Sequence, residues 1–523
     1  MVATEQPPRR GWRVGSHPVF WVCGTHVLLG LLFFDPKPFI GGDNFWYMIL
    51  GESLRSGNGY RDLWLPTAPH HVHYPPVYPL LLAVTGWLFN SVVAFKMLSL
   101  ACTTAAVGFT YALARRRTGD TRLSLAAALL VAVAPAIVEY SHWELSEAPF
   151  LLLVTISLYA FVRDPESHDL SVFAFGSAAA LAAYLTRSAG SALLFAIVVG
   201  LALRKRWTRL GWFAGVSALI VLGWWLYVRS TAAEGVTYTT YGQEFFYRDP
   251  YRPELGHVTL SELVRRVVEN LKVYLLSAWP QTIGGRDLDR GAAAAVGLLL
   301  GGGVLGGALR SVRKPGVPEF FFFGYIGLIL LWPQAWSDQR FVLPLVPLAA
   351  VYLVEAIAWA LPLDRERAPS GRLGLAHGVV GACVAFALFA NVRIVRSSLG
   401  CTRAVLGGQP YACYPSAFAD FVKASKWIAD HAESAAVVIS RKPQILYWYG
   451  RRRGDLYPFT NDADSLVRFL DARKARYVVV DNLYGTTWHY LVPAIQSHAN
   501  RFRPVHQEGN PPTYVLEYLG GAR

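Results

Sequence analysis

Long apolar stretches dominate this chain and limit what it can fold into. A helix needs about 20 mostly apolar residues to cross the hydrocarbon core of a bilayer, and fewer where the membrane is thinned. Segments of this kind lie at 18–34, 91–114, 121–138, 148–162, 171–187, 190–203, 211–228, 290–309, 317–333, 341–360 and 373–392. They predict a polytopic α-helical membrane protein with about eleven transmembrane helices.

The composition agrees with a membrane location. Only 16% of the 523 residues are charged, whereas about a quarter are charged in soluble domains. Aromatic residues make up 14%, with 17 Trp, and Trp and Tyr favour membrane interfaces. In a membrane protein, the positive residues behind the net charge of +14 show which loops face the cytoplasm. They do not indicate a nucleic-acid partner.

The positive charges predict the orientation. Short cytoplasmic loops collect Lys and Arg, and the basic clusters are Arg9/Arg10/Arg13, Arg115/Arg116/Arg117, Arg163, Arg204/Lys205/Arg206/Arg209, Arg310/Arg313/Lys314 and Arg365/Arg367/Arg372. All fall on one side if the apolar run 75–89 is interfacial or re-entrant and does not cross. The segments 35–90, 139–147, 229–289, 334–340 and everything after 393 then lie outside the plasma (inner) membrane.

Two domains are expected. Residues 1–400 form the transmembrane catalytic domain, with a first outer loop at 35–90 and a long one at 229–289. Residues 401–523 change to the pattern of a small extracytoplasmic α/β domain, with helices at 418–432 and 463–475 and strands at 435–440, 477–481 and 513–519. This domain either caps the outer mouth or holds an acceptor. Cys401 and Cys413 are spaced for a disulfide on that side.

Carboxylates in the outer loops are the first candidates for chemistry. Asp43 follows the first apolar span, and Glu147 directly precedes the fourth, where an unpaired charge is costly. Glu139 and Glu144 lie in the same loop as Glu147. Carboxylates meeting from separate loops could act as a general base and an orienting group, or could hold a metal. The alternative is a solvated acidic loop.

Histidines in the first outer loop suggest a second site. His70, His71 and His73 occupy three of four positions, and imidazole nitrogen binds divalent metals. We therefore predict that a divalent metal, if present, is bound by His71, His73 and Glu144. Donation to a phosphate or a plain polar loop are the other interpretations.

Two arginines break the positive-inside pattern. Arg187 and Arg340 lie at the outer ends of spans, where an Arg could snorkel to headgroups. Together, on the same face as the acidic loops, they favour an anion site, because guanidinium pairs bidentately with phosphate. The loop 229–289 adds Tyr238, Tyr241 and Glu244, an aromatic and polar mixture that suits a sugar or an interface belt.

The order of these motifs resembles a known fold. The Gly-Asp-x-x-x-Tyr, Gly-x-Gly-Tyr, Tyr-Pro-Pro-x-Tyr-x-Leu-Leu, Ser-Glu, Leu-Thr-Arg and Arg-Phe-x-x-Pro-x-x-Pro elements, over roughly residues 15–395, are similar to the GT-C fold. Within it they resemble the polyprenyl-phosphate-sugar-dependent branch, which includes protein O-mannosyltransferases and the aminoarabinose transferases of lipid A.

The resemblance implies roles for these residues. Asp43 takes the place of the catalytic carboxylate of the first loop, and Glu147 that of a further acid. Arg187 and Arg340 fall where phosphate-binding charge is expected, with Tyr74, Tyr241 and Glu244 as substrate-binding residues. His73-Tyr74 replaces the Glu-Lys of the aminoarabinose transferases, and the mannosyltransferases have a His in this region.

The implied activity is inverting transfer of a sugar from a polyprenyl-phosphate-linked donor to a lipid, glycan or protein acceptor. An oligosaccharyl transferase or glycan polymerase that uses a lipid pyrophosphate is the enzymatic alternative, although the C-terminal region has no Trp-Trp-Asp tripeptide. A secondary transporter would place polar residues near midspan in paired halves, and a membrane scaffold would not need Asp43.

Overall fold

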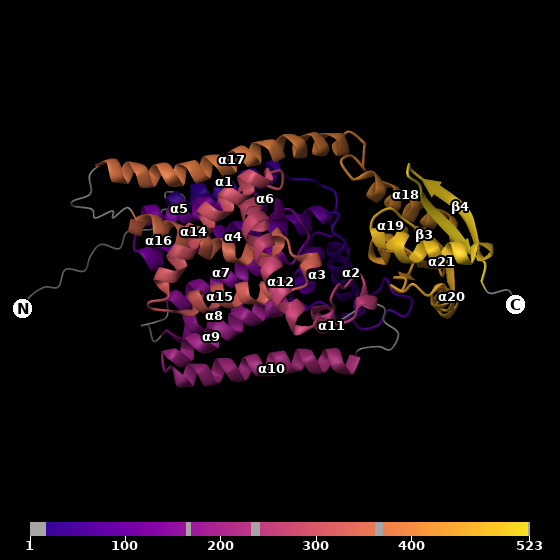
Figure 1. The fold of residues 1–523 in the computed structure, drawn as a ribbon, viewed down its shortest axis with the longest axis horizontal. Helices are drawn as coiled ribbons and strands as arrows, with labels where there is room; N and C mark the ends of the chain where they lie inside the picture. Colours follow the sequence, from indigo (N-terminus) through magenta and orange to yellow (C-terminus); the bar gives the residue numbers. More distant parts are fainter. Residues whose placement is uncertain (1–16, 164–168, 232–240, 361–369, 521–523) are drawn as a thin grey trace, which may run out of the picture.

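The computed structural model describes residues 17–163, 169–231, 241–360 and 370–520. Its long helices run alongside one another in a bundle, with a small α/β unit at one end (Figure 1). Each segment expected to span the membrane contains a helix: α1 (Pro18–Leu32), α4 (Val92–Thr118), α5 (Thr121–Ala132), α7 (Glu147–Arg163), α8 (Leu170–Tyr184), α9 (Ser191–Leu203), α10 (Trp207–Thr231), α14 (Arg290–Ser311), α15 (Val317–Leu331), α16 (Val346–Ala360) and α17 (Ser370–Leu406).

These helices differ in length. Among the described residues, five helical stretches are long and apolar enough to cross a membrane unaided: Val92–Thr118, Trp207–Thr231, Arg290–Ser311, Gln339–Ala360 and Gly378–Leu406. The other spans are shorter, and a 15-residue helix is only about 22 Å long. The number of eleven crossings therefore stays a prediction. The span predicted at 121–138 is interrupted by Pro135, which begins the separate helix α6 (Pro135–Tyr140), because proline disfavours helical backbone at the residue before it.

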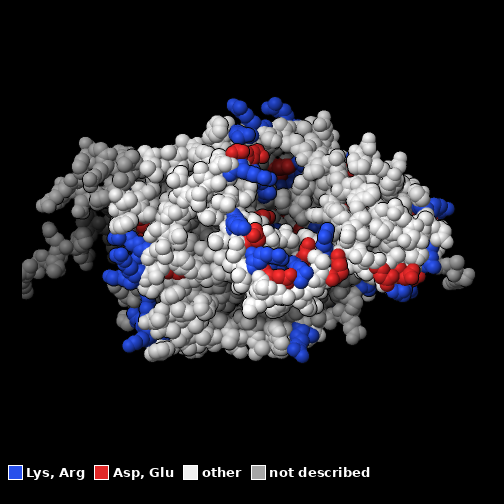
Figure 2. All heavy atoms as spheres, in the orientation of Figure 1, with Lys and Arg blue, Asp and Glu red and all other residues white. Residues whose placement is uncertain are grey.

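Basic clusters meet at one end of the bundle. Arg117 reaches Ser311 Oγ at 3.0 Å and Glu319 at 2.8 Å, and the Arg204 guanidinium lies beside Gly316. The clusters at 115–117, 204–209 and 310–314 thus share the end opposite the α/β unit, where blue spheres gather in Figure 2. The clusters at 9–13 and 365–372 lie outside the side chains that the structure describes.

Two short helices lie in the predicted first outer loop, residues 35–90. They are α2 (Asp43–Arg55) and α3 (Val77–Leu88), and they pack closely where Gly51 meets Leu82 and the carbonyl of Pro79. The apolar run 75–89 is therefore a helix of 12 residues lying against α2. This length is too short for a full crossing and fits the interfacial interpretation.

The second long outer loop contains α11 (Tyr241–Phe246), α12 (Leu260–Val273) and α13 (Trp279–Gly284). Asn270 fixes α12 to the end of α15, because its amide donates to the carbonyls of Leu330 at 2.9 Å and Trp332 at 2.7 Å. These two carbonyls belong to the last turn of a helix and lack helical partners. Tyr238 lies outside the described residues.

The C-terminal unit is a five-stranded sheet with helices. Its elements are α18 (Ser416–His431), β1 (Val437–Ile439), α19 (Pro443–Gly450), β2 (Gly454–Asp455), α20 (Ala463–Ala472), β3 (Ala475–Val480), α21 (Val492–Ser497), β4 (Phe502–Glu508) and β5 (Thr513–Tyr518). The strand order is β2-β1-β3-β5-β4. β1 runs parallel to both β2 and β3, whereas β5 runs antiparallel to β3 and β4.

This unit is attached to both outer loops. Gly454 N donates to the Trp64 carbonyl at 2.8 Å, and Tyr490 Oη donates to Glu254 at 2.8 Å. A disulfide joins Cys401, near the end of α17, to Cys413. The α/β unit is therefore held directly over the loops that carry the candidate site residues.

Candidate active site

Asp43 is positioned by a turn at the start of α2. Gly42 has a φ of +96°, a backbone conformation that side-chain-bearing residues rarely adopt. The turn places Asp43 in the first turn of the helix, where the N–H groups and the helix dipole favour a negative charge. Its carboxylate accepts a hydrogen bond from Arg340 Nη2 at 3.2 Å.

Glu147 connects the two arginines predicted from the sequence. Its Oε1 lies 2.6 Å from Arg187 Nη1 and 3.1 Å from Arg340 Nε. The Glu147 side chain is only 2% exposed. Its buried carboxylate therefore depends on the two arginines for compensation of its charge. Four residues that are far apart in sequence therefore form one network, Asp43–Arg340–Glu147–Arg187.

Neighbouring side chains fix the arginines. Arg187 Nη1 also donates to Ser146 Oγ at 2.9 Å, and Ser146 Oγ lies 3.1 Å from Tyr47 Oη. The turn that carries Arg340 begins at Asp338, whose carboxylate accepts from the Arg340 backbone N–H at 2.9 Å. The guanidiniums are thus oriented by groups on α2, α7 and the loop after α15.

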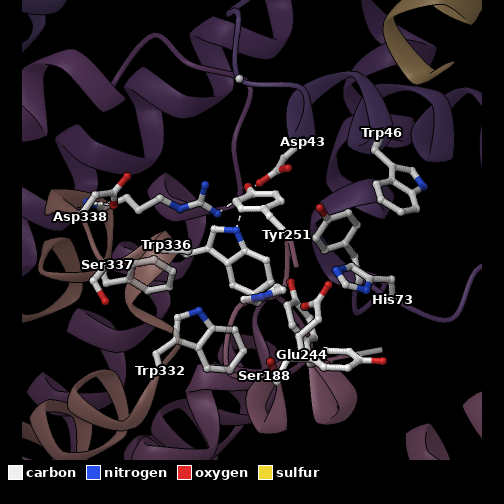
Figure 3. Close-up of a pocket in the computed structure, with 18 of the residues that line it drawn as sticks. Asp43, Trp46, His73, Ser188, Glu244, Tyr251, Trp332, Trp336, Ser337 and Asp338 are labelled. Atoms are coloured by element: carbon white, nitrogen blue, oxygen red, sulfur yellow. Dashed lines mark hydrogen bonds and ion pairs between the residues drawn. The ribbon is translucent and has the colours of Figure 1, made fainter. Parts of the chain in front are cut away.

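The network borders a cavity of about 790 Å³ between the bundle and the α/β unit. Asp43, Arg187 and Arg340 line it, and so do the predicted substrate-binding residues Tyr74, Tyr241 and Glu244. In Figure 3, Asp43, Trp46 and His73 stand on one side of this pocket, and Trp332, Trp336, Ser337 and Asp338 on the other. The structure therefore brings most of the predicted site residues together.

Glu147 differs from the role expected for it. Its carboxylate is buried against Arg187 and Arg340 and does not line the cavity. A group in this position cannot reach a substrate hydroxyl. We therefore revise its predicted catalytic role to the positioning of the two guanidiniums.

The predicted metal cluster of His71, His73 and Glu144 is wrong. Among the described residues, no group of three or more His, Cys, Asp and Glu side chains could hold a metal ion. Both ring nitrogens of His71 are used, Nδ1 at 2.9 Å from Asp62 and Nε2 as acceptor from Tyr74 N at 2.7 Å. His71 thus braces the loop before α3.

The other two members of that predicted cluster have separate surroundings. Glu144 is completely buried and pairs with Lys96 at 3.3 Å, which also makes it a structural residue. His73 lines the cavity, where its ring is parallel to Trp46 within 5° at a centroid distance of 5.5 Å. Its centroid lies 4.3 Å from that of Tyr241, so His73 belongs to an aromatic wall.

Several lining residues were not predicted from the sequence. Trp332, Trp336 and Tyr251 come from outer loops, and Trp336 Nε1 donates to Tyr251 Oη at 2.9 Å. Arg441 and Lys442 come from the α/β unit. The close spacing of Trp332 and Trp336 in the sequence could have indicated an aromatic site at the end of this span. Nothing in the local sequence indicates that residues 441 and 442 reach the cavity.

The electrostatic setting keeps Asp43 ionised. Burial alone would raise its pKa, but Arg340 and Lys442 outweigh this effect and hold the pKa of Asp43 below its ordinary value. The hydrogen bond from Arg340 acts in the same direction. Asp43 is therefore a carboxylate at neutral pH, the form that can accept a proton.

Comparisons with known proteins agree on the architecture. The family model described as "Dolichyl-phosphate-mannose-protein mannosyltransferase" matches residues 73–227, less than half of the chain. No curated protein sequence matches the chain. The chain is similar to a crystal structure of ArnT from Cupriavidus metallidurans in the apo state, with 14% identity, a TM-score of 0.61 and coverage of 97% of this chain and 99% of that one.

Two further structures have the same likeness. ArnT from Cupriavidus metallidurans bound to undecaprenyl phosphate gives a TM-score of 0.59 at 14% identity, covering 97% of this chain and 99% of that one. An Archaeoglobus fulgidus oligosaccharyltransferase tethered with an acceptor peptide gives 0.56 at 13% identity, covering 96% of this chain and 74% of that one. These likenesses confirm that the chain has the GT-C fold that its sequence motifs resemble.

Proposed function

We propose that this protein is an integral membrane glycosyltransferase that transfers a sugar, with inversion, from a polyprenyl-phosphate-linked donor to an acceptor outside the plasma membrane. One observation carries the proposal: Asp43, Arg187 and Arg340, from three distant segments, border a single cavity above an apolar bundle. The family model and the ArnT structure described as bound to undecaprenyl phosphate support the donor class.

The arginines would bind the donor phosphate. As the bond between the anomeric carbon and the phosphate oxygen breaks, its electron pair stays on that oxygen, and negative charge develops there. Guanidinium groups already held by Glu147 can stabilise this charge without reorganising. Leu328 and Ile329 of α15 line the same cavity and provide an apolar wall on the side where a lipid tail would leave.

Asp43 would be the base. An acceptor hydroxyl oxygen attacks the anomeric carbon opposite the departing phosphate and gives its proton to Asp43, and this single displacement inverts the configuration. Arg340 links the two events, because its guanidinium contacts Asp43. When the donor phosphate also occupies Arg340, the phosphate charge offsets that of the guanidinium, so the proton affinity of Asp43 rises when donor is bound.

The aromatic wall suits the sugar ring. His73, Trp46 and Tyr241 stack beside Asp43, and Trp332 lies 5.9 Å from Tyr241 between ring centroids. Aromatic faces pack against the apolar faces of a sugar, while Glu244 supplies a hydrogen-bond acceptor in the same cavity.

Charge and cysteine chemistry support the proposed outer location of the cavity. The described basic clusters gather at the end of the bundle away from the cavity, as expected of a cytoplasmic face. The Cys401–Cys413 disulfide lies beside the loop that carries Asp43, since Tyr414 Oη donates to the Pro38 carbonyl at 3.0 Å, and disulfides persist in oxidising compartments. The acceptor, a lipid, a glycan or a protein, would thus approach from outside the cell.

Two steps test this proposal. Mass spectrometry of envelope lipids and glycans from a deletion strain should show loss of one sugar substituent, which identifies donor and acceptor. With these substrates, Asp43→Asn in the purified chain should lower transfer at least about 100-fold, whereas Asp287→Asn, at an exposed outer-loop carboxylate, should leave it unchanged.

Arg340→Ala should weaken use of the donor far more than use of the acceptor. Transfer retained by folded Asp43→Asn would refute its role as base. A scaffold would show no effect of either substitution, and a transporter would move the lipid without forming a glycosidic bond.

A further inference from the structure

The α/β unit faces the cavity with the carboxyl ends of its parallel strands. Arg441 and Lys442 follow β1, Tyr457 and Phe459 follow β2, and Tyr484 follows β3, and all of them line the cavity. In open α/β sheets, ligands bind outside the carboxyl ends of the strands. The unit therefore presents its ordinary ligand-binding edge to the candidate active site.

Arg441 is held rigidly at this edge. It is 7% exposed, and its Nε donates to Thr486 Oγ1 at 2.8 Å. The guanidinium carbon lies 4.7 Å from the ring centroid of Tyr484 and 5.2 Å from that of Phe459. Aromatic rings therefore frame the guanidinium of Arg441, which lines the cavity.

Lys442 reaches across to the first outer loop. Its Nζ lies 2.7 Å from the place that a Cβ at Gly42 would take, so the ammonium rests against the turn that precedes Asp43. The Lys442 Nζ is also 5.0 Å from the ring centroid of Tyr484. The absence of a side chain at position 42 thus lets a residue of the α/β unit enter the cavity.

The charges of the two sides of the cavity differ. Arg187 and Arg340 are matched by Glu147 and Asp43 in direct ion pairs. Within the described parts of the chain, Arg441 and Lys442 make no direct ion pair, but the charge of Arg441 acts on the buried Asp481 and that of Lys442 acts on Asp43. Residues 441 and 442 therefore add positive charge to the cavity beyond that of the ion-paired Arg187 and Arg340.

We propose that Arg441 and Lys442 form a second phosphate-binding subsite, on the part of the same cavity that the α/β unit lines. A guanidinium fork and an ammonium suit a phosphate monoester or diester, and the surrounding rings suit an attached sugar. The phosphate belongs either to the lipid donor or to a phosphorylated acceptor. This inference rests on the proposed function only in taking the cavity as the transfer site.

Binding to the full-length protein in lipid nanodiscs tests the subsite. The probes are undecaprenyl phosphate for a lipid source and glucose 1-phosphate for a soluble one, with glucose as the uncharged control. Lys442→Gln should weaken binding of at least one phosphate probe about tenfold, and Arg441→Lys, which keeps the charge but loses the fork, should weaken the same probe. Lys426→Gln removes an exposed lysine of the same unit outside the cavity and should change nothing.

The outcomes separate the two proposals. Weaker binding of undecaprenyl phosphate alone assigns the subsite to the donor, and weaker binding of glucose 1-phosphate alone assigns it to the acceptor. Unchanged affinity for both probes in Lys442→Gln and Arg441→Lys overturns the inference. If Arg340→Ala then still loses undecaprenyl phosphate, the proposed function stands without the subsite, whereas full binding by Arg340→Ala counts against the proposed function itself.

Discussion

Replacing Glu147 by Gln tests whether this residue holds the active-site arginines. The substitution keeps the shape of the side chain but removes the charge shared by Arg187 and Arg340. Breaking a buried ion pair by removing one partner costs about 3–5 kcal/mol, because the other charge is left uncompensated. Because Arg340 keeps Asp43 as a partner and both arginines border the cavity, we expect a loss near the lower end, about 3 kcal/mol, and an apparent Tm lower by roughly 3 °C or more.

Thermal denaturation of the purified protein in detergent, followed by intrinsic fluorescence, measures this effect. Glu269→Gln is the matched control, because Glu269 pairs with Lys272 and their side chains are 39% and 58% exposed, and such surface pairs contribute about 0–1 kcal/mol. The double variant Glu147→Gln/Arg187→Gln should regain part of the lost stability, since it also removes one uncompensated charge. A Tm of Glu147→Gln equal to that of the unmodified protein would refute the network as described.

Three further predictions concern the junction between the loops and the α/β unit. Gly42→Ala should lower transfer while the protein still inserts, because a φ of +96° is strained for alanine and its Cβ would displace the Lys442 ammonium; activity assays check it. Burial raises the pKa of Asp481 to about 6 from 3.8, so the unfolded chain ionises first and stability should fall from pH 4 to pH 6; Asp481→Asn should flatten that slope in Tm measurements. Replacing Cys401 and Cys413 by Ser should cost roughly 3 kcal/mol, measured as a lower Tm under non-reducing conditions.

The sequence predicts the bundle well because hydropathy is a local property. The segment 91–114 corresponds to Val92–Thr118, and 211–228 to Trp207–Thr231. The interruption at Pro135 was missed, although the residue is visible, because an apolar run continues on both sides of it. In the C-terminal unit, the helix predicted at 418–432 is Ser416–His431, but β2 has only two residues, too few for any alternation pattern.

The site was predictable where topology alone brings residues together. Charge and parity predict that Asp43 and Arg340 lie on the same side of the bundle, and the structure brings their side chains to 3.2 Å from each other. The partners of His71 were not predictable, because Asp62 and the Tyr74 backbone meet it only through the fold of the loop. The predicted metal ligand His71 therefore stabilises the conformation of its loop through these two hydrogen bonds.

Arg441 and Lys442 show why the rest of the site escaped the sequence. Nothing in their local pattern distinguishes them from solvated charges at the end of a strand. Whether they reach the cavity depends on how the α/β unit packs against the loops. That docking is specified by dispersed contacts, such as Gly454 with Trp64 and Tyr490 with Glu254. Since these contacts aim the carboxyl ends of β1, β2 and β3 at Asp43, the unit is a wall of the cavity and not a cover above it, and a change in its docking alters the charge beside Asp43.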